Sequence, residues 1–446
     1  MLTRFIPPLY LKGVIVGFLT LALLIPIAQL DNLVSARVAS RGEAALRVAE
    51  SWGGPQTTAG VVLAVPVDRT VTLSSNQQEV IRDTVYVLPD TLDVAADVGP
   101  SYRTVGLYRT PVYLANIDIK GAFSPRDYTL LAPKEGHVVR WQEAKLVVLN
   151  SDSASLRAVE DFVIDGGAAE IGADGYAAYA GVSAPVPELA LQKTGGFPFR
   201  LRLKIAGSSQ LLFLPLARKA DIDIRSTWPH AKFEGGPSPL NPQIGDDGFR
   251  AHWSVIEINR SFGQTWADDV VRPGLQAGAA FAQSRVGVTF YEPVDVYQRN
   301  YRAVHYAILF IVITFLTFFL WEHVSGLAIH TMQYLMVGLA LALFYLLLLA
   351  LSEHLSFDLA YGISAGALVG LITVYLTGAL RSRARAFGAG AGLATLYGML
   401  YWILRSEDYS LLMGSLLLFG ILTILMVSTR RVDWSQVSRS REGEQA

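Results

Sequence analysis

The apolar residues of this 446-residue chain are gathered in one run near the start and five runs after residue 302. A helix needs about 20 residues to cross a bilayer, because each residue advances roughly 1.5 Å. The predicted spans are Gly13–Leu30, Val304–Trp321, Met332–Leu351, Leu359–Leu380, Ala386–Leu404 and Ser410–Thr429. None contains Asp, Glu, Lys or Arg, whereas buried helices of a soluble domain normally show a polar face. The pattern predicts a membrane α-helical bundle of six transmembrane helices.

The first run favours an uncleaved signal-anchor helix, within residues 1–30, over a cleaved signal peptide. Its apolar stretch is longer than the roughly 7–15 residues of a signal peptide, and Ala28-Gln29-Leu30 is a poor cleavage site. We therefore expect the chain to keep this span. Residues 303–429 then form a five-helix bundle, and 430–446 form a polar tail.

The basic residues of the short loops predict the orientation, because such loops are richer in Lys and Arg on the cytoplasmic side. With six spans, one face receives Arg4, Lys12, Arg381, Arg383, Arg385, Arg430, Arg431, Arg439 and Arg441. The short loops on the other face carry Arg405 alone, while Arg299 and Arg302 end a long segment in which the rule is weak. Both termini are therefore expected on the cytoplasmic side of the membrane, and residues 31–302 are expected on the opposite side.

The long segment 31–302 is rich in short β-branched or alternating runs separated by glycine and proline. Phe199–Ile205 alternates apolar residues with cations, as expected of a strand with one buried and one wet face. Val286–Phe290 resembles a last strand before the membrane, and Asp31–Ser51 favours a helical stalk that extends the first span. We expect an exported all-β domain, sandwich-like and antiparallel.

Composition excludes several functional classes. The net charge of −1 provides no basic field for nucleic acid, so no nucleic-acid partner is expected. The absence of cysteine excludes disulfides, thiolate metal sites and cysteine nucleophiles. Gly388–Gly392 is glycine-rich but follows no strand, so it is not a dinucleotide-binding loop, and no cofactor is predicted.

Histidines and carboxylates cluster at the ends of the predicted spans. Ser352, Glu353, His354, His305 and Asp358 fall near the outer face, and Glu322, His323 and His330 fall near the inner face. Such groups could bind a divalent cation or relay protons, and the alternative is that they simply end helices in water. The spacing matches no metal motif, so the metal content is left open. The loop Ser352-Glu353-His354 is the strongest candidate, because it places a hydroxyl, a carboxylate and an imidazole beside hydrocarbon.

Small residues recur at regular spacing in two of the predicted spans. Glycines recur every four residues at Gly362, Gly366 and Gly370, and again at Gly388 and Gly392. We expect these small faces to form the internal contacts of the bundle, and they would also suit a homo-oligomer contact. The G-x-S-x-G pattern of Gly362–Gly366 lies inside an apolar span, where the hydrolase elbow cannot form.

The segment around Trp228 has two interpretations. Trp228, His230 and Lys232 lie in a stretch interrupted by proline and glycine. They form either a packed turn between strands or a recognition loop.

Several stretches resemble the bacterial inner-membrane protein CreD family. They are Gly54-Pro55-Gln56 with Leu63–Val67, Ser226–His230 with Phe233, Gly248-Phe249 and Trp253, and Tyr306–Leu309, His330–Leu339 and Phe344–His354. The matches run in order along nearly the whole chain. Thr331 stands where the family often has proline after the loop histidine, which removes one helix-start signal.

The resemblance implies a link to a two-component regulon, envelope integrity, colicin tolerance and the response to β-lactams, and it supplies no catalytic residues. The expected function is therefore an envelope-integrity or stress-response protein, more consistent with a non-enzyme. Its exported domain would bind a cell-envelope or membrane protein partner, and its bundle would lie in the lipid bilayer to anchor or signal. Two alternatives stay open: a transporter or channel, and a membrane-embedded enzyme that uses Ser352, Glu353 and His354.

Overall fold

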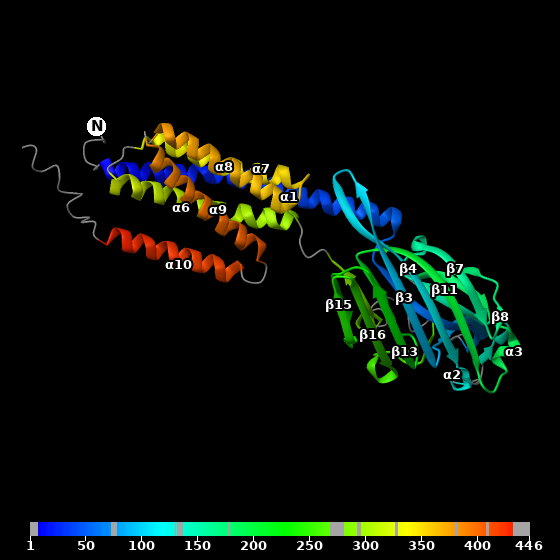
Figure 1. The fold of residues 1–446 in the computed structure, drawn as a ribbon. Helices are drawn as coiled ribbons and strands as arrows, with labels where there is room; N and C mark the ends of the chain where they lie inside the picture. Colours follow the sequence, from blue (N-terminus) through cyan, green and yellow to red (C-terminus); the bar gives the residue numbers. More distant parts are fainter. Residues whose placement is uncertain are drawn as a thin grey trace, which may run out of the picture. The chain divides into compact units, whose positions relative to one another are not determined.

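The computed structural model describes residues 8–72, 78–129, 131, 137–176, 179–267, 281–291, 296–325, 329–379, 382–406 and 410–430. Two compact units divide the chain: residues 1–40 with 294–446, and residues 41–293. The first is helical and the second is rich in β-strands (Figure 1).

In the described part of the chain, the helical unit has helices at all six predicted spans, and five of them are long and apolar enough to cross a membrane. Its helices are α1 (Pro8–Trp52), α6 (Val296–Ser325), α7 (Thr331–Ser352), α8 (Phe357–Ala379), α9 (Arg383–Arg405) and α10 (Ser410–Thr429). Among the described residues, the helices that are long and apolar enough to cross a membrane are α1, α6, α7, α8 and α9. Helix α10 contributes a shorter apolar stretch, Leu412–Thr423. The predicted stalk is confirmed as helix, because α1 continues to Trp52.

Aromatic and aliphatic side chains form the centre of this unit. Phe344 on α7 lies 5.5 Å from Tyr361 on α8 and 4.7 Å from Tyr397 on α9, measured between ring centroids. All three side chains are buried, and the Tyr361 hydroxyl donates to the backbone oxygen of Tyr397 at 2.6 Å. These contacts hold α7, α8 and α9 together, since each helix buries one apolar stripe against the others.

The β-rich unit contains two sheets. The 10-stranded sheet comprises β1 (Gln56–Thr72), β2 (Gln78–Val87), β5 (His137–Val139), β6 (Lys145–Asn150), β9 (Gly172–Tyr176), β10 (Tyr179–Pro185), β12 (Gln210–Phe213), β14 (Ala231–Gly235), β17 (Thr265–Ala267) and β18 (Val286–Phe290). The 8-stranded sheet comprises β3 (Thr91–Val105), β4 (Tyr108–Phe123), β7 (Leu156–Ile164), β8 (Gly167–Ala168), β11 (Phe197–Ser208), β13 (Lys219–Ser226), β15 (Leu240–Gly245) and β16 (Gly248–Ile256). Two short helices, α2 (Pro125–Thr129) and α3 (Glu188–Leu191), lie in loops.

The two sheets share one hydrophobic core. Leu63 on β1 and Leu201 on β11 belong to the same buried cluster. The ten-stranded sheet buries its second face as well, where Val62 and Tyr86 pack with Trp266. The second face of the eight-stranded sheet is wet, and β11 alternates buried apolar residues with accessible cations as predicted. The β-rich unit therefore has one charged sheet face.

The expectation of purely antiparallel pairing is wrong at two places. β1 pairs in parallel with β12, and β13 pairs in parallel with β3. Parallel neighbours need long crossover connections, and more than a hundred residues separate β3 from β13. Local alternation does not reveal such a pairing.

Candidate functional site at the ends of the helix bundle

Ser352 is tied into the bundle by a neighbouring helix. It is the last residue of α7, and its buried Oγ accepts a hydrogen bond from Asn300 Nδ2 on α6 at 2.8 Å. The same Oγ donates to the backbone oxygen of Leu349 at 2.9 Å. Asn300 also donates to Val296 at 2.9 Å and is 1% exposed. The hydroxyl therefore joins α6 to α7.

Glu353 forms an ion pair that the sequence analysis did not anticipate. Its Oε1 lies 3.1 Å from Arg37 Nε on α1, and its side chain is 10% exposed. His354, the next residue, is exposed, and its backbone N–H donates to Leu351. The three predicted partners therefore face different surroundings: Ser352 meets α6, Glu353 meets α1, and His354 is on the surface.

His305 and Asp358 are also placed beside other helices. His305 Nδ1 lies 3.6 Å from Asp31 Oδ1 on α1 and 3.0 Å from the backbone oxygen of Tyr301. Asp358 on α8 accepts a hydrogen bond from the Tyr401 hydroxyl on α9 at 3.0 Å. Together with Ser352 and Glu353, these contacts form a polar end of the bundle, which we call the α7–α8 end.

Arg302 binds the C-terminal end of α9 at this α7–α8 end. Its Nη2 donates to the backbone oxygens of Ile403 at 3.0 Å and Ser406 at 3.1 Å. These carbonyls lie at the C-terminus of α9, where helix carbonyls lack intrahelical partners and a cation is favourable. The guanidinium that departed from the orientation rule is thus used as a helix cap.

The opposite end of the bundle carries a second charged cluster. Glu322 on α6 is contacted by Lys12 on α1, by the Tyr334 hydroxyl on α7 at 3.1 Å and by the Ile329 backbone N–H at 3.0 Å. Lys12 Nζ also donates to the Ile329 backbone oxygen at 2.5 Å. The carboxylate therefore gathers three segments of the chain around one negative charge.

His330 caps α7 at this same end. Its Nδ1 accepts from the Met332 N–H at 3.3 Å, and Gln333 completes a capping box. This cap starts the helix at Thr331 without the proline that the resemblance would place there. The side chain of His323 lies outside the described part of the chain.

The described residues contain no set of side chains that is assembled to bind a metal ion. No group of three or more His, Asp or Glu side chains there could hold an ion. Of the predicted residues, His305 has Asp31 nearby, and the pair supplies only two groups.

The predicted glycine faces do not pack against neighbouring helices, which corrects the sequence-based expectation. A Cβ at Gly362, Gly366, Gly370, Gly388 or Gly392 would meet no atom within 4 Å. The tight positions are Gly338, where a Cβ would lie 2.4 Å from Leu23 Cδ1, and Gly390, where it would lie 2.2 Å from Thr373 Oγ1. Periodicity locates small faces, but only the neighbouring helix decides which one is covered.

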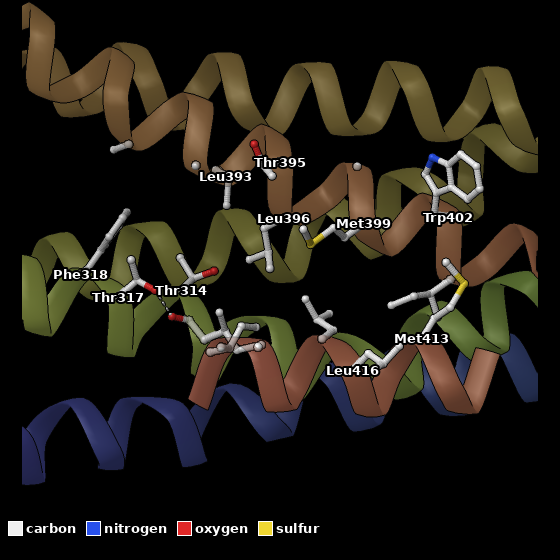
Figure 2. A pocket seen from close by; sticks show the side chains of 18 of the residues that line it. Thr314, Thr317, Phe318, Leu393, Thr395, Leu396, Met399, Trp402, Met413 and Leu416 are labelled. Carbon is white, nitrogen blue, oxygen red and sulfur yellow. Dashed lines mark hydrogen bonds between the residues drawn. The ribbon is translucent and has the colours of Figure 1, made fainter. Parts of the chain in front are cut away.

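Gly388 and Gly392 instead line a groove of about 940 Å³ formed by α6, α9 and α10. Figure 2 shows Thr314 and Thr317 of α6 and Leu396 and Met399 of α9 among the residues that line this groove. The threonine hydroxyls donate to backbone oxygens of their own helix, Phe310 and Ile313, at 2.7 Å. The groove therefore presents an apolar lining.

The candidate recognition segment divides between core and surface. Trp228 is 6% exposed, and its Nε1 donates to the backbone oxygen of Tyr291 at 3.1 Å. His230 and Lys232 are exposed, and Lys232 Nζ lies 3.0 Å from Glu234. The geometry of Trp228 is that of a packed turn, and the recognition role of His230 and Lys232 stays a prediction.

The wet face of the eight-stranded sheet holds charged residues that sequence reasoning did not single out. A depression of about 460 Å³ lies over β3, β4, β11, β13 and β16. Its charged lining comprises Asp97, Asp118, Arg202, Asp223, Arg225 and Arg250. The alternation in each strand predicted a polar face, but the adjacency of these residues depends on strand order.

Comparison with known proteins gives three findings. A family model described as "Inner membrane protein CreD" matches residues 8–435. Inner membrane protein CreD of Escherichia coli (strain K12) is 31% identical over 435 residues, which cover 96% of this chain and 94% of that protein. A solved M1 zinc metallopeptidase from Deinococcus radiodurans matches with 10% identity, covering 38% of this chain and 39% of that one, at a TM-score of 0.19. The last likeness is too slight to bear on the fold.

Proposed function

The chain belongs to the CreD family of inner membrane proteins, and from this premise we propose that it is an envelope-integrity protein of the CreD type. Its β-rich unit lies in the periplasm and binds a cell-envelope protein. Its helices anchor that unit in the membrane, with α10 as the sixth span. Both termini are cytoplasmic in this proposal.

One observation carries the binding part of the proposal: two arginines stand directly opposite each other on the wet sheet face. Arg225 on β13 is in register with Arg250 on β16. Arg225 has a carboxylate partner, Asp97, at 2.8 Å, whereas no carboxylate in the described residues pairs with Arg250. Like charges opposite each other in a sheet are unfavourable. An acidic group on a partner would relieve this repulsion and fit the charged depression.

The anchoring part rests on the ion pairs of α1. Lys12 pairs with Glu322 near one end of the bundle, and Arg37 pairs with Glu353 at the α7–α8 end. These two ion pairs, some 25 residues apart on α1, fix the rotation of this helix against α6 and α7. Ser352 and Glu353, on which a membrane-embedded enzyme would depend, both bond other helices, which favours an anchoring role over catalysis there.

The test is crosslinking in growing cells from a photoreactive amino acid at position 95, where an exposed alanine lines the same depression and both arginines are kept. We expect a discrete crosslinked protein that is absent when the same group replaces Thr194, an exposed residue before β11. Adding Arg250→Gln to the position-95 probe should weaken the crosslink, because it removes one of the two guanidiniums that the acidic group would meet. Identical products from both positions would overturn the binding proposal.

A further inference from the structure

A two-stranded arm projects from the eight-stranded sheet. β3 and β4 pair with each other from Thr91 to the turn at Val105 and Tyr108, but β13 accompanies β3 only as far as Val98. On the other side, β11 accompanies β4 only from Val112 onward. Residues 99–111 therefore extend beyond the sheet as a hairpin, which is visible in Figure 1.

The tip of the arm exposes apolar and aromatic side chains. Gly106, at φ +61°, and Leu107 form its two-residue turn. Leu107 is 57% exposed and Tyr102 is 37% exposed. Exposed aliphatic and tyrosine side chains at a hairpin tip are costly in water. They are typical of elements that enter the bilayer interface.

Three arginines surround this arm, and no carboxylate in the described residues pairs with them. Arg103 and Arg157 lie with their Cζ atoms 4.0 and 5.2 Å from the ring centroid of the same Trp52. Arg109 lies 3.8 Å above the ring of Tyr102. Arg157 is also fixed by a hydrogen bond from its Nη2 to the backbone oxygen of Trp52 at 2.6 Å. Two guanidiniums thus share one indole, an arrangement that a nearby anion would stabilise.

The arm lies at the end of the β-rich unit where the chain enters and leaves. Trp52, the last residue of α1, donates from Nε1 to the backbone oxygen of Tyr113 on β4 at 3.2 Å. The departing strand β18 ends at Phe290, whose N–H donates to Ser209 beside the last residue of β11. The opposite end of β11 pairs Phe197 with Phe123. Both connections to the membrane helices are therefore on the arm's side of this unit.

We propose that the arm of residues 99–111 is a membrane-surface anchor that binds anionic phospholipid headgroups. Arg103, Arg109 and Arg157 contact the headgroup phosphates, for which guanidinium is a strong hydrogen-bonding partner. Leu107, at the turn of the arm, enters the interface beneath them. The stacking on Trp52 and Tyr102 orients the cations before lipid arrives, which lowers the entropic cost of binding.

The test uses the full-length protein in vesicles and a spin label at the tip. The chain has no cysteine, so Leu107→Cys and Thr194→Cys each carry a single nitroxide, the second at the far end of β11. Vesicles of phosphatidylethanolamine with phosphatidylglycerol are compared with vesicles of phosphatidylcholine alone. We expect the Leu107→Cys label to gain oxygen collisions and lose collisions with a water-soluble nickel complex only in the anionic vesicles.

Two further variants make the result decisive. Arg103→Gln and Arg109→Gln remove guanidiniums for which the structure gives ring contacts and no hydrogen bonds. Each should lower the ratio of immersed to water-exposed label about fivefold, the change expected for one basic residue at an anionic surface. Added salt should act in the same direction. A label that stays water-exposed in anionic vesicles, or enters equally in neutral ones and in the Gln variants, would overturn the proposal. These outcomes do not depend on whether the sheet face binds a partner.

Discussion

Single polar residues at the ends of the membrane helices chiefly form hydrogen bonds and ion pairs with neighbouring helices. Ser352 bonds Asn300, and Glu353 pairs with Arg37. A hydroxyl or carboxylate at the edge of hydrocarbon is costly unless it has a partner. Here the partner comes from a distant segment, so each contact restrains two helices at once.

At this scale we expect Arg37→Gln to destabilise the protein by about 1–3 kcal/mol, because it leaves the mostly buried Glu353 without its guanidinium. The double variant Arg37→Gln with Glu353→Gln should lose less than the sum of the two single changes. Thermal unfolding in detergent measures the cycle, and Arg47→Gln, an exposed position on the same helix, serves as the control. A coupling energy of zero would contradict a stabilising ion pair between Arg37 and Glu353.

A second residue-scale feature is Asp68 on β1. Its Oδ1 accepts from Arg82 Nε at 2.9 Å, and its Oδ2 accepts from Arg140 Nε at 2.7 Å. The hydrogen bonds from Arg82 and then Arg140 lower the pKa of Asp68 below its ordinary value of 3.8. Since the folded state favours the carboxylate, its contribution to stability is complete above the unfolded pKa and is lost as the pH falls through the folded one.

The stability difference between the wild type and Asp68→Asn should therefore be constant from about pH 6 to 8 and shrink below about pH 4. Unfolding midpoints measured across that range test it. Asp246→Asn, in the exposed turn before β16, should show no comparable trend. A difference that grew on acidification would refute the assignment.

At the scale of elements, glycines have different roles according to what faces them. Gly338 lies on α7 where a Cβ would be 2.4 Å from Leu23 on α1 and 2.7 Å from Phe315 on α6. Gly366 on α8 faces open space. The close approach of α1, α6 and α7 therefore depends on one small residue, as in other membrane helix contacts.

We expect Gly338→Ala to destabilise the bundle by about 1–3 kcal/mol through overpacking. Gly366→Ala should be neutral or stabilising by up to about 1 kcal/mol, because alanine favours helix. Comparative thermal unfolding of the two variants in detergent provides the measurement. Equal stability of both would show that the contact at Gly338 relaxes without cost.

At the scale of the whole molecule, the proposed orientation has a direct test that exploits the cysteine-free chain. In cells with a permeabilised outer membrane, Thr194→Cys should react with a membrane-impermeant maleimide. A cysteine added after Ala446 should react only after lysis. This follows from the bias of basic residues toward cytoplasmic loops. Protection of position 194 together with labelling at the C-terminus would reverse the topology.

Hydropathy and alternation along the chain predicted the apolar membrane helices and the β-rich character of most of residues 31–302. Uncharged stretches such as Met332–Leu351 lie within helices of nearly the same bounds, because transfer into lipid and helix length are local, additive properties. The alternation of Phe199–Ile205 likewise fixed which side chains of β11 are wet.

Which distant residues meet depends on how the separate elements pack in three dimensions. Nothing local in Glu353 indicates Arg37, and nothing in β3 indicates its parallel partner β13. The glycine periods of α8 and α9 were visible, yet Gly338 is the one pressed against α1 and α6. Such contacts depend on how separate segments pack and on strand order, so their energies arise between elements and leave no periodic trace within any one of them.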